Sequence, residues 1–355
     1  MLGILTRAPR VRARLLRGVL AWYCRAGFGG GVRPLSASVY LTNACNLDCS
    51  FCYVKQARPA VNTMPRTMFD SVIRDLGGLG VVYLSLTGGE PLLLPDVVER
   101  VAQARRAGIP YLHMVSNAEL LTVERAQALH AAGLTELSVS LDGWEDGHDR
   151  RRGRTGLFAK VWPLLQELHH AVPGLMLVVN SVVMDDNLDE LRTLTAAVRA
   201  AGLFHKFQPE LAWDGSRPAA HDATTAQWRD FSRELAAQPQ VLNSRTFLAW
   251  LPEFRRTGCV PAVGSSCLYP THHVKIIETG EVFPCYLGCG GKCRFTYDGD
   301  LRRLLDSPAY RATVAGLRVC RACTRQMFVC YLEPRLVFPA GNFLRHALAR
   351  RSLHP

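Results

Sequence analysis

Acidic residues are missing from both ends of this 355-residue chain, and lysine is scarce throughout, with five lysines against 37 arginines. Residues 1–33 hold seven arginines and residues 335–355 hold four, so the ends account for 11 of the 12 net positive charges. The body between them is almost neutral. Enzymes that act on nucleic acids more often carry a basic stripe on the folded body. The charge distribution therefore argues against a nucleic-acid partner.

The N-terminal region also lacks an apolar run of the roughly 20 residues that a bilayer-spanning helix needs, and we expect no cleavable signal. Residues 2–23 instead form a basic amphipathic pattern, with apolar residues at helical spacing between arginines. Such a helix can lie in a membrane interface with Trp22 and Tyr23 at the boundary. Packing against the body is the alternative. We predict a cytoplasmic protein, either free or peripheral at the inner face of the membrane.

Twelve cysteines are present, but a disulfide framework is typical of short secreted chains and does not suit this one. Cys45, Cys49 and Cys52 are spaced Cys-x3-Cys-x2-Cys. Thiolates this close suit one metal centre, either zinc or an iron–sulfur cluster. Structural zinc needs four ligands, and the sequence offers no fourth nearby. A cubane cluster on three cysteines leaves one iron open to a small molecule, and Phe51 places a flat ring where it can face an adenine.

Strand and helix patterns alternate from Ser36 onwards. Strands are predicted at 36–44, 81–89, 111–117, 136–143, 175–184 and 205–212, and helices between them at 65–77, 95–107, 122–132, 157–171 and 188–201. Repeated units of this kind predict a parallel sheet with right-handed crossovers. The fold class is therefore α/β, and six units suit a partial (β/α)6 TIM-like barrel. Chemistry in such barrels lies at the carboxyl ends of the strands.

Short polar residues and glycines end several of these strands. The second strand ends in Gly88, Gly89 and Glu90, where glycine lets the backbone approach a ligand closely and a carboxylate can accept bonds from an ammonium group. The later strand ends supply Ser116, Asn117, Ser140, Asp142 and Asn180. Turn or helix-cap chemistry is the alternative role for each of these residues.

The stretch LTNACNLDCSFCYVK, residues 41–55, resembles the signature of the radical S-adenosylmethionine (radical SAM) superfamily. The resemblance implies that the three cysteines hold a [4Fe–4S] cluster and that SAM chelates the open iron. One electron then splits SAM into methionine and a 5′-deoxyadenosyl radical. It also implies that the Gly-Gly-Glu motif binds the SAM amino group and that the later polar residues contact its ribose and carboxylate. The run SVSLDGWEDGHDRRRG, residues 138–153, is similar to the peptide-modifying and sulfatase-maturing branch.

A second group of cysteines resembles the SPASM domain, the auxiliary-cluster domain of many radical SAM maturases. It comprises Cys259, Cys267, Cys285, Cys289, Cys293, Cys320, Cys323 and Cys330. The match rests on Cys267 and Cys285 around a predicted hairpin at 274–285 and on the later pair Cys320 and Cys323. These four are the first choice for one auxiliary [4Fe–4S] cluster, with Cys259 and Cys330 as the next candidates. Zinc is the alternative for the later pair. A second auxiliary cluster would need Cys289 or Cys293, because Pro334 stands where the family has a cysteine.

The predicted organisation follows these motifs. It comprises a basic helix with a glycine-rich joint at 1–33, a radical SAM core at 34–215, a bridging segment rich in aromatic residues at 216–257, a SPASM- or twitch-like domain at 258–335 and a basic tail at 336–355. We predict an oxidoreductase or maturase-like enzyme that abstracts hydrogen from a peptide or protein and takes electrons from a flavodoxin or ferredoxin. A lipid, isoprenoid or other small hydrophobic metabolite is the alternative substrate, favoured by the basic ends. A non-catalytic iron–sulfur redox protein is the third reading, and the complete motif set argues against it.

Overall fold

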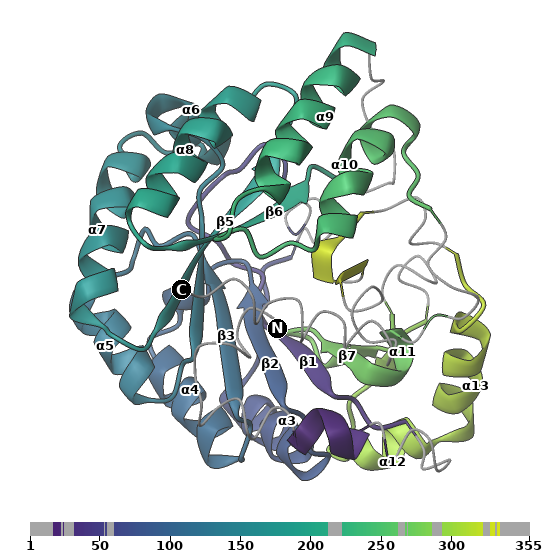
Figure 1. Cartoon of the computed structure of the whole chain (residues 1–355). Coiled ribbons are helices and arrows are strands. Elements are labelled where there is room, and N and C mark those ends of the chain that lie inside the picture. The colour runs from purple at the N-terminus through teal and green to yellow at the C-terminus, as the bar shows by residue number, and fades with distance from the viewer. Residues whose placement is uncertain are drawn as a thin grey trace.

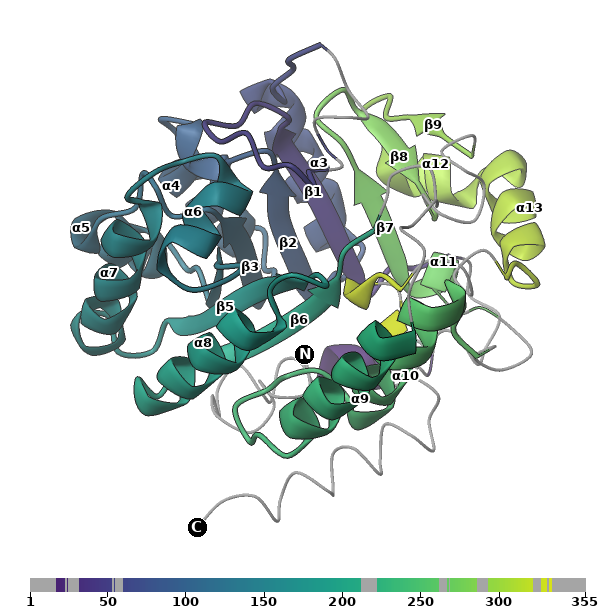
Figure 2. The same ribbon diagram turned by 90° about the horizontal axis from the view of Figure 1, so that it is seen from above.

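One curved sheet organises the part of the chain that the computed structural model describes. The described residues are 17–22, 24, 32–52, 54, 60–211, 222–261, 267, 269–285, 293–321, 327–330 and 332–333. Within them the sheet has nine strands in the order β6-β5-β4-β3-β2-β1-β7-β8-β9. The helices of the first two-thirds of the chain lie on the outer side of its parallel part (Figures 1 and 2).

The six predicted parallel strands are confirmed. They are β1 (Ser36–Thr42), β2 (Tyr83–Gly88), β3 (Tyr111–Ser116), β4 (Glu136–Ser140), β5 (Met176–Val183) and β6 (Phe204–Pro209), each paired in parallel with the next. The crossovers carry α3 (Arg66–Gly78), η2 (Pro91–Leu93), α4 (Val97–Arg106), α5 (Val123–Ala131), α6 (Glu145–Arg152), α7 (Leu157–Ala171) and α8 (Leu188–Ala200). The predicted partial (β/α)6 barrel is therefore the fold of the core.

Alternation along the strands separates an apolar outer face from a polar interior. On β2, Leu84 and Leu86 are fully buried in the core beneath the helices. Ser85 points to the other side, where its Oγ lies 2.9 Å from Nδ1 of His113 on β3. The interior of the barrel is therefore built to hold polar groups.

The predicted hairpin is also confirmed, and it extends the barrel sheet. β7 (His273–Ile276) pairs in parallel with β1, and β8 (Glu281–Phe283) and β9 (Phe295–Thr296) follow antiparallel to it. The preceding α11 (Tyr269–His272) and the later α12 (Leu301–Asp306) and α13 (Pro308–Leu317) complete this unit. Tyr297 donates from its hydroxyl to Asp75 of α3 at 2.8 Å, which fixes the unit to the barrel. The sequence did not predict that the hairpin would join β1.

Two helices of the bridging segment cover the margin of the sheet at β6. They are α9 (Asp222–Ala236) and α10 (Arg245–Thr257), which pack against each other beside α8 (Figure 1). Phe231 of α9 packs edge-on against Phe207 of β6, with ring centroids 5.9 Å apart. Trp228 is also buried and donates from Nε1 to Asp185 at 2.9 Å. Aromatic residues of this segment thus serve core packing.

Residues 17–22 form the described part of the N-terminal helix, and this helix packs on the body. Trp22 is buried, its Nε1 donates to the Arg33 carbonyl at 2.8 Å, and its ring lies edge-on to His272. The prediction that Trp22 stands at a membrane boundary is therefore wrong, because the body supplies its partners. Leu20 remains 65% exposed, and Tyr23 lies outside the described residues. None of the described helices is both long and apolar enough to cross a bilayer.

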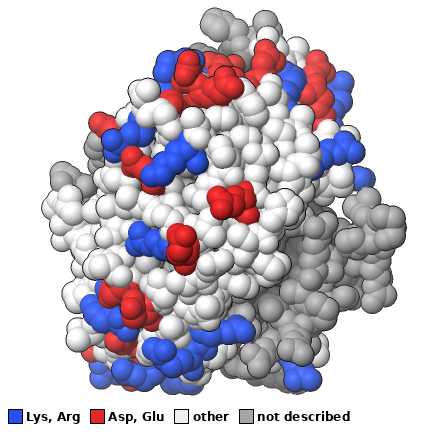
Figure 3. All heavy atoms as spheres, turned by 90° about the vertical axis from the view of Figure 1, so that its left-hand side faces the viewer, with Lys and Arg blue, Asp and Glu red and all other residues white. Residues whose placement is uncertain are grey.

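Charged side chains of both signs are mixed on the face that carries α5 and α7 (Figure 3). Blue and red groups there are scattered over a largely uncharged surface. This face presents no continuous field of one sign.

Candidate iron–sulfur and SAM site

The cysteine loop leaves the carboxyl end of β1 and is held by the end of β2. The backbone N–H of Gly89 donates to the Thr42 carbonyl at 2.7 Å, and that of Glu90 donates to the Ala44 carbonyl at 2.8 Å. A Cβ on Gly88 or Gly89 would overlap these same two carbonyls. The two glycines are thus needed so that β2 can approach the cysteine loop, a role the sequence did not predict.

Glu90 joins two other predicted site residues, Ser116 and Asn117, in one buried cluster. One carboxylate oxygen accepts from Ser116 Oγ at 2.8 Å and from the Leu92 N–H at 2.9 Å. The other accepts from the Asn117 N–H at 2.7 Å. Burial raises the pKa of Glu90, and these donors act in the opposite direction. The ends of β2 and β3 are therefore fixed to each other by one carboxylate.

Asn117 connects this cluster to the cysteine loop. Its Nδ2 donates to Asn46 Oδ1 at 2.9 Å and points to the Cys45 sulfur at 3.8 Å. The next residue, Ala118, has a left-handed backbone with φ of 61°, unusual for a residue with a side chain. Such strain concentrates at functional sites, and here it shapes the turn that presents Asn117.

Arg152 makes the second connection to the cysteine loop. Its guanidinium donates to the Asp142 carboxylate at 2.5 Å and to the Cys49 sulfur at 3.7 Å. The same guanidinium lies 5.3 Å from the centroid of the Phe51 ring. Asp142 is fully buried, and its other oxygen accepts from the Val182 N–H at 2.7 Å. The SAM contact expected of Asp142 stays a prediction, and its observed partners make it the anchor of Arg152.

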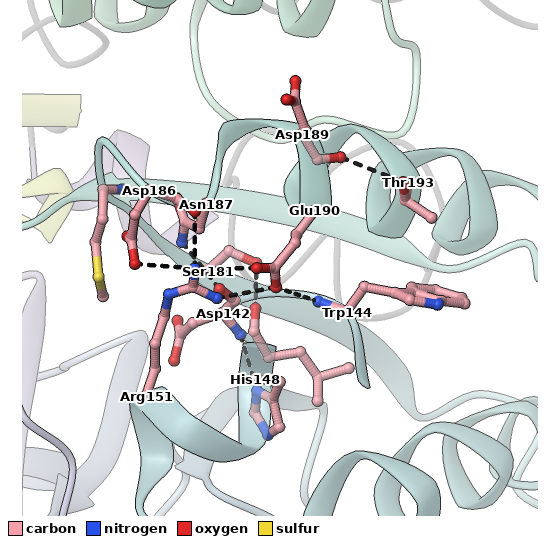
Figure 4. A network of polar contacts seen from close by, with 12 residues as sticks. Asp142, Trp144, His148, Arg151, Ser181, Asp186, Asn187, Asp189, Glu190 and Thr193 are labelled. Carbon is pink, nitrogen blue, oxygen red and sulfur yellow. Dashed lines mark hydrogen bonds and ion pairs between the residues drawn. The ribbon is translucent and has the colours of Figure 1, made fainter. Parts of the chain in front are cut away.

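Two side chains, His148 and Glu190, accept hydrogen bonds from the backbone of the loop between β4 and α6 (Figure 4). His148 accepts from the Asp142 N–H at 3.1 Å, and burial together with the neighbouring arginines lowers its pKa to about 3, so it stays neutral. Glu190 accepts from the Trp144 N–H and from Arg151, each at 2.9 Å. Sequence reasoning missed this support and missed Arg152, although both arginines stand in the DGHDRRRG run that was noted.

The thiols of the three cysteines lie close enough to influence one another electrostatically. Burial raises the pKa of Cys45 and Cys49, and the Cys52 thiolate adds to both shifts while Arg152 opposes them. Among the described residues, no three Cys, His, Asp or Glu side chains converge on a single-ion site. A cluster of several irons accepts sulfur ligands further apart than one ion does, and N–H donors to the ligand sulfurs are typical of its surroundings. Asn117 and Arg152 are such donors.

The remaining predicted residues lie in one row across the sheet. Ser140, the last residue of β4, is in register with Asn180 of β5, which lies three residues before the end of its strand. This is the end of the barrel from which the cysteine loop departs. The structure therefore brings all nine predicted SAM-site residues to one end of the barrel, and their contacts with SAM stay predictions.

The later cysteines are partly placed. Cys267 and Cys285 are buried, and the Cys267 N–H donates to the Arg318 carbonyl at 2.6 Å, which brings it to the segment of Cys320. Cys259 and Cys330 are exposed, and the Cys330 charge acts on Tyr83 inside the barrel. Cys323 and Cys289 lie outside the described residues, so the auxiliary ligand set stays a prediction.

Comparison with known proteins identifies the family. The profile described as the radical SAM superfamily matches residues 39–197. The PqqA peptide cyclase of Ruegeria pomeroyi is 33% identical over 268 residues, which cover 71% of this chain and 68% of that protein. The sporulation killing factor maturation protein SkfB of Bacillus subtilis is 30% identical over 171 residues, 48% of this chain and 41% of that protein.

Solved structures show the same fold. Streptococcus suis SuiB bound to the precursor peptide SuiA superposes with a TM-score of 0.62 at 16% identity, over 83% of this chain and 70% of that one. The enzyme anSMEcpe with bound AdoMet gives a TM-score of 0.64 at 15% identity, over 89% of this chain and 99% of that one.

The chain belongs to the radical SAM superfamily. It is an enzyme whose cofactors are a [4Fe–4S] cluster and SAM, as the sequence predicted.

Proposed function

We propose that this enzyme modifies a peptide or protein. The match to a peptide-modifying relative carries the proposal, because the PqqA peptide cyclase is 33% identical over 71% of this chain. The polar groups of the barrel interior do not decide the substrate class. His113 pairs with Ser85 and Ser138, and Glu136 pairs with Tyr111, so these groups already have partners within the chain.

The relatives support the same substrate class. The relative that is 33% identical over 71% of this chain acts, by its name, on the peptide PqqA. The fold is also that of SuiB, which was solved with a precursor peptide. The basic N-terminal helix was an argument for a hydrophobic substrate, but its Trp22 packs on the body of the protein.

The described residues have distinct roles in this proposal. The loop cysteines hold the cluster, with Asn117 and Arg152 orienting Cys45 and Cys49. Glu90 and the Gly-Gly backbone accept the SAM amino group, and Ser140 and Asn180 stand where the rest of SAM extends. When bound, the cluster and SAM supply a 5′-deoxyadenosyl radical that removes a hydrogen atom from the substrate. The protein positions the groups and excludes water.

Three further parts belong to the proposal. An auxiliary [4Fe–4S] cluster binds to Cys267, Cys285, Cys320 and Cys323 beside the β7–β8 hairpin. A flavodoxin or ferredoxin supplies the electron. The exposed side of the N-terminal helix, which includes Leu20, makes the peripheral membrane contact.

The substrate class can be tested with peptides encoded by open reading frames next to the gene. Anaerobically reconstituted, reduced protein is incubated with SAM and each synthetic peptide, and 5′-deoxyadenosine and peptide mass are measured. We expect one peptide to stimulate 5′-deoxyadenosine release and to lose hydrogen. Stimulation by isoprenoid or lipid fractions, with none by any peptide, would favour the alternative substrate.

A further inference from the structure

Lys206 on β6 points into the barrel. Its neighbours His205 and Phe207 face the helices, since His205 lies 2.8 Å from Ser181 Oγ and 3.2 Å from Thr195 Oγ1 of α8, and Phe207 packs on Phe231 of α9. Side chains alternate along a strand, so Lys206 lies on the interior face.

Lys206 lies at the same height along the barrel as the residues that are predicted to bind SAM. Lys206 is in register with Asn180 of β5, which is in register with Ser140 of β4. Ser140 is the last residue of β4, Asn180 lies three residues before the end of β5, and both are predicted to contact SAM. Lys206 therefore stands one strand beyond the predicted SAM site.

Within the described part of the chain, Lys206 makes no hydrogen bond or ion pair, so its ammonium has no direct partner there. Its charge acts on the buried Glu136 and the partly buried Glu333. Burial raises the pKa of each carboxyl, and Lys206 lowers it. Both carboxylates have other partners. Glu136 accepts from Tyr111, and Glu333 accepts from the Ser244 N–H at 2.7 Å. The three donors of the half-buried lysine are thus available.

A second lysine lies on the opposite margin of the parallel sheet. Lys275 of β7 is buried, and its Nζ lies 4.3 Å from the centroid of the Tyr40 ring. β6 and β7 are the two ends of the parallel strand order, so the barrel interior is bounded by a cation on each side. Two of the five lysines in this arginine-rich chain occupy these positions.

We propose that Lys206 binds a carboxylate of the substrate, supplied by an aspartate, a glutamate or the C-terminus of a peptide. The inference rests on the proposed peptide function and adds that the substrate is acidic where it enters the barrel. A carboxylate here would pair with an ammonium that is already partly desolvated, which strengthens the attraction.

The experiment is a selection from a random peptide library on immobilised, anaerobically reconstituted holoenzyme with SAM. Wild type is compared with K206Q and K206E. K160E is the matched control, because Lys160 is an exposed lysine that donates to the Glu119 carbonyl outside the barrel. Selected peptides are then resynthesised with each Asp or Glu replaced by Asn or Gln, and their dissociation constants are measured on every variant. SAM affinity and iron content are measured alongside.

We expect wild type and K160E to enrich acidic residues at one peptide position and K206E to lose this enrichment. One acidic residue should contribute about tenfold to wild-type affinity and almost nothing to K206Q affinity. If K206E does not fold, K206Q decides. Peptide binding without acidic preference, acidic preference unchanged in K206Q, or a K206Q effect confined to SAM affinity would overturn the inference while leaving the peptide function standing. Failure of every variant to select any peptide would overturn both.

Discussion

Replacing Arg152 by methionine should destabilise the protein strongly, because it breaks a buried ion pair on one side only. Arg152 is 9% exposed and Asp142 is fully buried, and two guanidinium nitrogens lie 2.5 Å from the same carboxylate oxygen. Among the described residues, the substitution would leave that carboxylate with one donor, the Val182 N–H. Removing one partner of a buried pair costs about 3–5 kcal/mol. In a chain of 355 residues that corresponds to a Tm lower by roughly 4–7 °C.

The assay is urea unfolding of cluster-free, reduced protein followed by far-UV circular dichroism. Three consecutive arginines offer a matched control, since Arg150 is exposed, and R150M should stay within about 0.5 kcal/mol of wild type. The double variant D142N/R152M should recover part of the loss, because both members of the pair are then gone. Equal free energies of unfolding for R152M and R150M would refute the reasoning.

The same substitution should change the cluster itself. The Arg152 donor to the Cys49 sulfur favours the reduced, more negative cluster. We therefore expect a lower reduction potential in reconstituted R152M than in R150M, measured by potentiometric electron paramagnetic resonance. Identical potentials in the two variants, at equal iron content, would show that this contact does not influence the cluster.

Three further results are expected. The Cys45/Cys49/Cys52 triple alanine variant should keep about four irons with a cubane-like spectrum, because the later cysteines form the usual four-thiolate set; retention of no iron, or of zinc alone, would contradict the auxiliary cluster. Deleting residues 1–25 should reduce sedimentation with anionic liposomes at low salt, since each arginine near the surface contributes about 1 kcal/mol; equal sedimentation would reject membrane contact. Stability should fall as pH drops below about 6.5, which is the pKa of histidine in the unfolded chain. Burial lowers the pKa of His205 to about 3, so between about pH 6.5 and 3 only the unfolded state gains the proton. At pH 5 His205 alone should cost about 2 kcal/mol, and H205N should flatten the dependence.

The sequence was most informative where periodicity decided the structure. The predicted strand at 111–117 is β3 at Tyr111–Ser116, and the predicted helix at 157–171 is α7 with the same bounds. Parallel strands buried on the helix side read as apolar runs, and the helices between them end at glycines such as Gly133. These are local signals, so the core could be predicted without tertiary information.

Pairing between distant segments could not be predicted in the same way. Nothing in the residues around 274 indicates that β7 would pair with β1. That contact depends on the edge of β1 that β2 leaves unpaired, which is a property of the folded barrel. The close approach of Gly88 and Gly89 to the cysteine loop could not be predicted either, since only the structure shows which backbone they contact. Arg152 stood in a noted motif, but its contact with Cys49 spans 103 residues of sequence.

The most direct test of the central claim is release of 5′-deoxyadenosine from SAM by anaerobically reconstituted, reduced protein. Wild type is compared with C45A, C49A and C52A, and with C24A as a matched control, because Cys24 is exposed and precedes the barrel. The account predicts release by wild type and C24A and none by the three loop variants, because two thiolates cannot hold the cluster with one iron open to SAM. Release at the wild-type rate by C45A, C49A or C52A would contradict it.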